Sequence, residues 1–171
     1  MNQVLETIRQ RRSVRHFRPD PPPAETIRLL LEAATWAPSA GNLQPWEFWL
    51  VSDQALRQKL AAAASQRFLG EAPLVIVVCA RPGRSAAHYR ERGENLYCLQ
   101  DTAAAIQNLM LAAASLGLAT CWVGAFQEKQ VLEVLKLPHG RRPVALIPVG
   151  YPSILPKAPP RRPLEEVAHW R

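Results

Sequence analysis

Pro38-Ser-Ala-Gly-Asn-Leu-Gln-Pro-Trp46 is the stretch around which the rest of the chain can be interpreted. Prolines at both ends stiffen it, and Ser39, Asn42 and Gln44 place a hydroxyl and two amides between them. An amide both donates and accepts hydrogen bonds, as the polar edge of a nitrogen heterocycle requires. The stretch therefore predicts a preordered binding loop between a helix and a strand, with an ordinary capped loop as the alternative.

Apolar periodicity predicts two helices before this loop. Asn2 is placed to cap the first helix, and Pro23 or Ala24 begins the second. The residues expected on their apolar faces are Val4, Leu5 and Ile8 in the first helix and Ile27, Leu30, Leu31 and Ala34 in the second.

After the loop, helices and strands interleave without strict alternation. Strands are expected at 47–51, 74–80, 119–123 and 144–150, and helices at 54–64, 96–116 and 127–135. Residues 81–95 show no clear period, so we expect a loop there with one helical turn at most. This order predicts an α+β or mixed α/β fold with a central mixed β-sheet flanked by helices.

Local signals support several of these elements. Asp53 is a cap for one helix, and Gly117 is placed to end the long Ala-rich helix. Residues 74–80 are apolar throughout, as in a strand buried on both faces. The apolar run 103–122 is interrupted by polar side chains, so it predicts a buried helix plus a strand rather than a membrane span.

Length and composition favour one soluble domain, 1–171. Of the 171 residues, 48% are hydrophobic and 20% charged, which is typical of a globular protein. The final part, about 151–171, contains five prolines and is expected to be an extended arm. Its apolar residues suggest that it lies on its own domain or on a partner subunit, with disorder as the alternative; they are Ile154, Leu155, Leu164, Val167 and Trp170.

Several functional classes find no support. The N-terminus is polar and basic with no signal-peptide core, so the cytoplasm is the expected location. Cys79, Cys98 and Cys121 lack metal-type spacing and the four histidines are scattered, so neither a disulfide framework nor a metal site is expected. The common nucleotide-binding and hydrolase fingerprints are absent. Chemistry supplied by a bound cofactor fits this chain better than a strong acid, base or nucleophile of its own.

Arg11-Arg-Ser-Val-Arg15 is a second functional stretch, in a chain of net charge +7. If it is extended, Arg11, Ser13 and Arg15 point to one side and form a phosphate clamp of two guanidinium groups and a hydroxyl. A solvated basic face is the alternative. A nucleic-acid-binding surface is a third interpretation, although such a module needs a basic helix face or exposed aromatic residues between its charges.

Together these stretches resemble the nitroreductase family of FMN-dependent oxidoreductases. The blocks that carry the resemblance, all in one register, are Arg11–Arg15, Ala37–Trp46, Leu116–Ala125, Ile147–Pro152 and Pro160–Val167. They cover essentially the whole chain, and the Asn-x-Gln-Pro-Trp core of the second block is the most specific. The resemblance implies a nitroreductase-like fold with the C-terminal arm exchanged in an intertwined homodimer.

The resemblance also implies three groups of residues around FMN. The phosphate and ribityl chain would be held by Arg11, Arg12, Ser13 and Arg15, with Arg161 from the arm. The flavin would be lined from the other subunit by Pro38, Ser39, Asn42 and Gln44. Beside the isoalloxazine ring would lie Trp122, Val123 and Gly124, with the Gly124 amide near N5; no side chain is expected to act as the catalyst.

The implied activity is hydride transfer from NADH or NADPH to the flavin, followed by reduction of a nitroaromatic, quinone or flavin acceptor in a ping-pong sequence. No nucleic-acid or membrane partner is expected. Three alternatives stay open: enone reduction or dehalogenation on the same scaffold, a flavin protein without turnover, and a basic nucleic-acid-binding module. A polar pocket at 81–95, with His88, Tyr89, Arg90 and Arg92, would favour the first of these.

Overall fold

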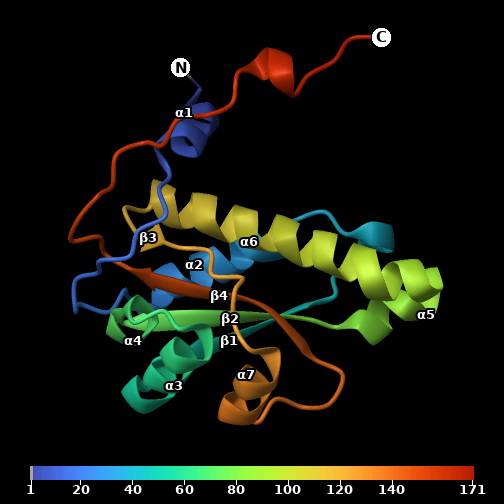
Figure 1. Cartoon of the computed structure of the whole chain (residues 1–171), viewed down its shortest axis with the longest axis horizontal. Helices are drawn as coiled ribbons and strands as arrows, with labels where there is room; N and C mark the ends of the chain where they lie inside the picture. Colours follow the sequence, from blue (N-terminus) through green and yellow to red (C-terminus); the bar gives the residue numbers. More distant parts are fainter. Residues whose placement is uncertain (1) are drawn as a thin grey trace.

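A four-stranded antiparallel sheet forms the centre of the computed structural model, which describes residues 2–171 (Figure 1). Its strands, β1 (Trp46–Val51), β2 (Leu74–Ala80), β3 (Ala119–Thr120) and β4 (Arg142–Gly150), lie in the order β1-β2-β4-β3. The expectation of a mixed sheet is therefore wrong for these four strands. Helices α3 (Gln54–Ala64) and α4 (Phe68–Glu71) bring the chain back to the end of β1 that it has just left, so β2 runs the opposite way. Parallel pairing within residues 2–171 is confined to the single bridge between Ser13 and Thr120.

Strand β2 is buried along its whole length, as its apolar sequence predicts. Alternate side chains of the strand, such as Ile76 and Val78, pack with α2 (Ala24–Thr35) and α6 (Cys98–Ser115). The intervening ones, such as Val77, pack on the other face with α3, α4 and α7 (Glu128–Leu135). Helices therefore cover both faces of the sheet, as Figure 1 shows.

The local cap signals are confirmed. Asn2 Oδ1 accepts a hydrogen bond from the Val4 amide at 2.9 Å at the start of α1 (Gln3–Gln10). Asp53 Oδ1 accepts from the Leu56 amide at 2.8 Å at the start of α3. Gly117 has φ +74° just after α6, which is the left-handed conformation that ends helices. The expected faces of α2 and α3 are also buried or half-buried.

Residues 81–95 form a helix, so the expectation of a loop is wrong. Helix α5 (Pro82–Arg92) begins with a proline in its first turn, and a π-helical turn, η2 (Gly93–Tyr97), leads from it into α6. No apolar stripe was visible because the one buried residue of α5 is the small, polar Ser85. Arg90 interrupts the helix with φ +51° and ψ −137°.

The strand expected at 119–123 is shorter than its apolar sequence suggests. Only Ala119 and Thr120 belong to β3, after which Cys121 and Trp122 leave the ladder. Val123 returns to it through an isolated bridge with Leu146. Cys121 and Trp122 therefore lie beside the sheet without pairing to it.

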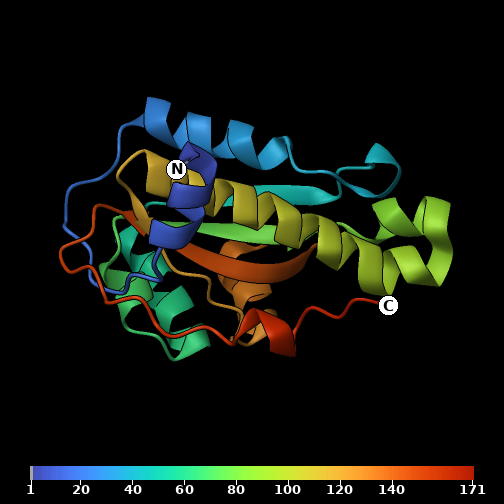
Figure 2. The ribbon, with the colours of Figure 1, turned by 90° about the horizontal axis from the view of Figure 1, so that it is seen from above.

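Helix α1 and the C-terminal arm lie on the side of α6 that faces away from the sheet (Figures 1 and 2). Apart from a short 3₁₀ turn, η3 (Leu164–Glu166), the arm is irregular. Neither α1 nor the arm buries its apolar residues; they are Val4, Leu5, Ile8, Ile154, Leu155, Leu164, Val167 and Trp170. Among residues 2–171, no helix is both long enough and apolar enough to cross a membrane.

Candidate cofactor-binding site

The stretch Arg11–Arg15 leaves α1 as extended chain and pairs with the edge of the sheet. Ser13 bridges to Thr120, and the Val14 amide donates to the Thr120 carbonyl at 3.0 Å. Val14 is 1% exposed, so its side chain points into the protein and those of its two neighbours point to the other side. The alternation expected from the sequence is present here.

Arg11, Ser13 and Arg15 converge on the buried thiol of Cys121. Burial raises the pKa of Cys121, whereas the charge of Arg15, a hydrogen bond with Ser13 and the charge of Arg11 each lower it. All three groups therefore lie within interaction range of one thiol. Two guanidinium groups and a hydroxyl on one side of an extended segment make a site suited to an anion.

Arg11 carries a buried polar atom without a partner. Its Nη1 atom has no hydrogen-bond acceptor within residues 2–171. A buried N–H of this kind costs free energy, and an anion beside it would remove that cost. Arg12 is already engaged, because its Nη1 donates to the carbonyls of Arg9 and Arg11 at 2.6 and 2.9 Å, at the end of α1. Of these two neighbours, Arg11 is the one suited to hold an anion.

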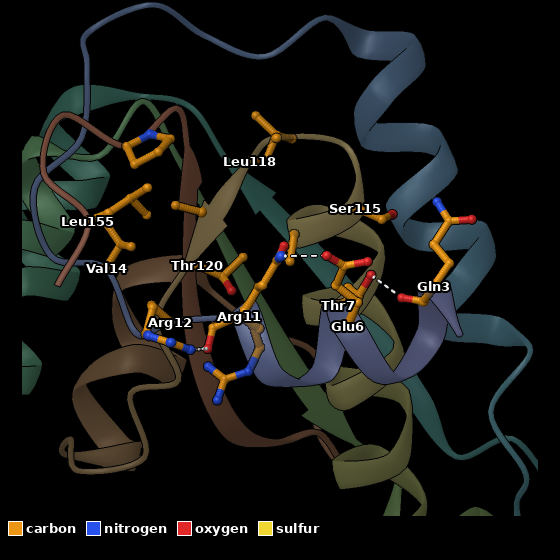
Figure 3. A pocket seen from close by; sticks show the side chains of 15 residues that line it. Gln3, Glu6, Thr7, Arg11, Arg12, Val14, Ser115, Leu118, Thr120 and Leu155 are labelled. Carbon is orange, nitrogen blue, oxygen red and sulfur yellow. Dashed lines mark hydrogen bonds between the residues drawn. The ribbon is translucent and has the colours of Figure 1, made fainter. Parts of the chain in front are cut away.

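Both arginines border a pocket of about 360 Å³ between α1, β3 and the end of α6 (Figure 3). Thr120 and Leu118 lie on its sheet side, and Leu155 comes from the arm (Figure 3). The arm thus approaches Arg11 and Arg12 through Leu155.

The segment after Cys121 lines a second pocket, of about 310 Å³. Trp122 is 39% exposed and lines it together with Gly124 and the N-terminal half of α6. Val123 points the other way: its side chain is in the core, and its N–H and C=O both pair with Leu146, at 3.1 and 2.9 Å. Val123 therefore attaches the segment to β4, while Trp122 and Gly124 face the pocket.

Loop 38–44 is held together by its own hydrogen bonds. Ser39 Oγ accepts from the Gln44 amide at 3.0 Å, and the Gln44 side-chain nitrogen donates to Asn42 Oδ1 at 3.3 Å. Gly41, Asn42 and Gln44 have φ of +58°, +54° and +51°. Asn42 and Gln44 are exposed, as is Pro38 before them. The polar groups that the sequence singled out are thus ordered and open to a ligand.

This loop and the arginine group (Arg11, Ser13 and Arg15) lie toward opposite ends of α6. The Ala40 amide donates to Asp101, in the first turn of α6, at 3.1 Å, whereas Arg11 shares its pocket with Ala114 in the last turn. At about 1.5 Å of rise per residue, the two points are roughly 20 Å apart along the helix. Arg161, on the exposed arm, has no hydrogen bond or ion pair within residues 2–171. One chain carries both halves of the expected site without bringing them together.

The donor groups fit a phosphate and a planar ring. The unsatisfied N–H of Arg11, with Ser13 and Arg15 beside it, suits the phosphate. The second pocket is lined mainly by apolar side chains, with exposed backbone at Gly124, and suits the ring. No group of three potential metal ligands occurs within residues 2–171.

A model of the nitroreductase family matches residues 8–69 and 62–151, which include every site residue discussed above except Arg161. The chain belongs to the nitroreductase family. As a member of this family it is an oxidoreductase, and its fold is the nitroreductase fold. The solved structure of a nitroreductase family protein from Streptococcus pneumoniae superposes with a TM-score of 0.90 at 25% identity, over 99% of this chain and 100% of that one.

Two curated nitroreductase-related proteins illustrate the similarity in sequence. An NADH dehydrogenase of Thermus thermophilus is 33% identical, in an alignment that covers 95% of this chain and 93% of that protein. An FMN reductase (NADPH) of Bacillus subtilis is 31% identical, in an alignment that covers 99% of this chain and 74% of that protein.

Three residues contact loop 38–44; Asp101 and Arg84 were missed from the sequence, and Tyr89 was considered only for a substrate pocket at 81–95. Asp101 binds the Ala40 amide, Arg84 Nε donates to the Leu43 carbonyl, and the Tyr89 hydroxyl packs against Gly41, where a Cβ atom would lie only 2.8 Å away. Arg84 and Tyr89 belong to the helix that the sequence pattern did not indicate. Asp101 lies 61 residues from its partner, and no local pattern relates the two.

Proposed function

We propose that the chain is an NAD(P)H-dependent flavin oxidoreductase that binds FMN as a homodimer. The arginine group carries this proposal: Arg11, Ser13 and Arg15 meet on one side of an extended segment, and Arg11 has a buried N–H that lacks an acceptor. The relatives named FMN reductase and NADH dehydrogenase support the choice of cofactor and electron donor.

Each FMN would be held by residues of both subunits. Arg11, Ser13 and Arg15 of one subunit bind the phosphate, and Arg161 adds a further cation from an arm. Trp122 and Gly124 lie beside the ring. Loop 38–44 of the second copy covers the flavin with Pro38, Ser39 and Asn42, and Gln44 contributes to the same edge. Arg12 stabilises the turn that presents the group, because its guanidinium already caps α1.

The surface of the single chain supports the dimer. Its accessible area is 10579 Å², whereas a compact 19.1 kDa monomer is expected to expose roughly 8,400 Å². The surplus agrees with the exposed apolar residues of α1 and the arm. Wrapping the arm around a second copy would cover these residues and bring each loop to the other chain's arginine group.

A bound FMN would supply the redox chemistry, which is hydride acceptance from NADH or NADPH followed by electron transfer to a second substrate. The chain's own residues act by binding and electrostatics. The Gly124 amide would offer a hydrogen bond to the ring of a bound flavin, and Arg11 and Arg15 would favour negative charge on it. No protein side chain needs to gain or lose a proton in this scheme.

The two substrates would use the same open face in turn, which is a ping-pong sequence. Planar acceptors such as nitroaromatics, quinones and free flavins fit a site that binds by stacking. The protein would work in the cytoplasm, with a single domain that includes the arm.

Steady-state kinetics of the FMN-loaded protein test the activity. Initial rates of NADH and NADPH oxidation are measured at several fixed concentrations of a quinone and of a nitroaromatic. Parallel lines in double-reciprocal plots are expected for ping-pong turnover. Intersecting lines would reject that order, and no oxidation of either nucleotide by flavin-loaded protein would reject the enzyme in favour of a flavin-binding protein.

A further inference from the structure

Loop 38–44 includes one backbone conformation that its sequence does not favour. Gln44 has φ +51°, which L-residues other than Asn and Asp seldom adopt, whereas Gly41 and Asn42 tolerate a positive φ. Five hydrogen bonds lie within the loop, three of them from Gln44, but they do not attach it to the rest of the protein. The position of the loop on the protein therefore depends on anchors from outside it.

The buried anchor is Asp101, in the first turn of α6. Its Oδ1 atom accepts a hydrogen bond from the Ala40 amide at 3.1 Å, and the residue is only 6% exposed. Cys98 and Ala105, one turn away on either side, are fully buried, so the helix that carries the carboxyl is fixed in the core. The other anchors, Arg84 and Tyr89, come from α5 and are more exposed than Asp101.

Asp101 also has an unexplained feature. Its Oδ2 atom is buried and has no hydrogen-bond partner within residues 2–171. A half-satisfied carboxyl in the interior costs free energy. The bond to Ala40 is the one direct link from this group to a functional segment.

We propose that Asp101 is a positioning residue for flavin binding. Through the Ala40 amide, it fixes loop 38–44 in the shape that lets Ser39 and Asn42 contact the FMN held by the arginine group of a second copy. This inference rests on the proposed function. It assigns to α6 a part in cofactor binding that does not require contact between Asp101 and FMN.

Two substitutions at Asp101 and one control test the proposal. Asp101→Ala removes the acceptor, whereas Asp101→Asn keeps an oxygen that can accept from Ala40. Asn108→Ala is the matched control, because Asn108 also lies on α6 and its Nδ2 donates to a distant backbone carbonyl, that of Ala33, at 3.2 Å. Its loss weakens the contact of α6 with α2 but leaves the loop anchor in place.

The measurements are the Kd for FMN, from titration of apo-protein by flavin fluorescence, and the visible circular dichroism of the bound flavin. Asp101→Ala is expected to weaken FMN binding about tenfold, equivalent to about 1.4 kcal/mol, and to change the flavin dichroism. Asp101→Asn and Asn108→Ala are expected to bind FMN as the parent protein does.

Two results would overturn the positioning role. Asp101→Ala could bind FMN with unchanged Kd and dichroism, or Asp101→Ala and Asn108→Ala could weaken binding equally, as general destabilisation would. If Asp101→Ala does not fold, Asp101→Asn still decides, because loss of FMN affinity in that folded variant contradicts the argument. Failure of the parent protein to bind FMN would instead reject the proposed function, so the two failures are distinguishable.

Discussion

Arg11 combines two properties that are rarely found together in a residue with a purely structural role. Its charge lowers the pKa of the buried Cys121 thiol, and one of its nitrogen atoms is buried without an acceptor. A structural arginine in such a place would normally be satisfied by a carbonyl or carboxylate, as Arg141 is by Glu47 at 3.0 Å. In the proposed function, the missing acceptor of Arg11 is the FMN phosphate.

Arg11→Gln should therefore weaken FMN binding by about tenfold or more, because charge-assisted hydrogen bonds to a phosphate contribute roughly 1.5–3 kcal/mol each. Lys59→Gln, on the exposed side of α3, makes the same change in net charge and should leave the Kd unchanged. Fluorescence titration of apo-protein measures both. Equal effects of the two substitutions on the Kd would mean that FMN affinity depends only on the net charge of the protein.

Asp101 gives a prediction about stability and pH. Burial raises its pKa above the ordinary value of 3.8, although the Ala40 amide partly opposes this. The folded state thus holds the proton more tightly, so the resulting stabilisation is complete below pH 3.8 and is lost as pH rises through the folded pKa. Asp101→Asn does not titrate, and its Tm relative to the parent protein should be higher at pH 7 than at pH 4. Parallel Tm–pH curves for the two proteins would contradict this.

At the residue scale, the sequence allowed prediction wherever the cause is local. The caps Asn2 and Asp53 and the alternation of Arg11, Ser13 and Arg15 follow from neighbours a few positions away. The partner of Asp101 depends on how α6 packs, so no pattern near position 101 indicates it.

At the scale of elements, α5 and η2 form a hairpin-like unit whose closest contact is between backbones. A Cβ atom added to Gly93 would lie 2.3 Å from the Ser85 carbonyl oxygen and 2.6 Å from its carbon. Ser85 itself is fully buried. Such a contact uses small residues rather than an apolar stripe, which explains why periodicity did not indicate a helix at 81–95.

Two glycines of α5 and η2 test this packing. Gly93→Ala should destabilise the protein by about 1–3 kcal/mol, since backbone atoms have little room to move away. Gly83→Ala meets nothing within 4 Å and should be neutral or stabilise the protein by about 0.4–1 kcal/mol. Urea unfolding gives both values. If Gly93→Ala were as stable as Gly83→Ala, the close approach of α5 to η2 would be wrong.

Strand pairing shows a second limit of prediction at this scale. The positions of β1, β2 and β4 follow from apolar runs and turn residues. Their direction depends on where each helical connection returns the chain, which a single sequence does not specify. The expected mixed sheet was therefore wrong, although helices do flank the sheet as predicted.

For the whole molecule, one proposal accounts both for the large accessible area and for the separation of loop 38–44 from the arginine group. The arm buries none of its apolar side chains, and Trp170 is 99% exposed. Loop 38–44 and the arginine group are toward opposite ends of α6. A second copy would cover the apolar arm and complete the site. The sequence indicated both groups of residues, but the distance between them required the fold.

Removing residues 154–171 should convert the dimer to a monomer with an intact fold, because this segment contributes nothing to the buried core. The bond from the Ser153 amide to the His16 carbonyl, at 3.0 Å, would be kept. Sedimentation velocity and far-ultraviolet circular dichroism measure the two properties. A truncated chain that remains a dimer and keeps its FMN affinity would show that the arm does not hold the subunits together.

The most direct test of the central claim is the visible absorption spectrum of the purified, FMN-loaded protein without oxygen, before and after addition of NADH or NADPH. The account predicts a bound-flavin spectrum that bleaches with at least one nucleotide and recovers when a quinone is added. Bound flavin that never bleaches would contradict the oxidoreductase mechanism proposed for this chain. Failure to bind FMN at all would contradict the assignment of the arginine group.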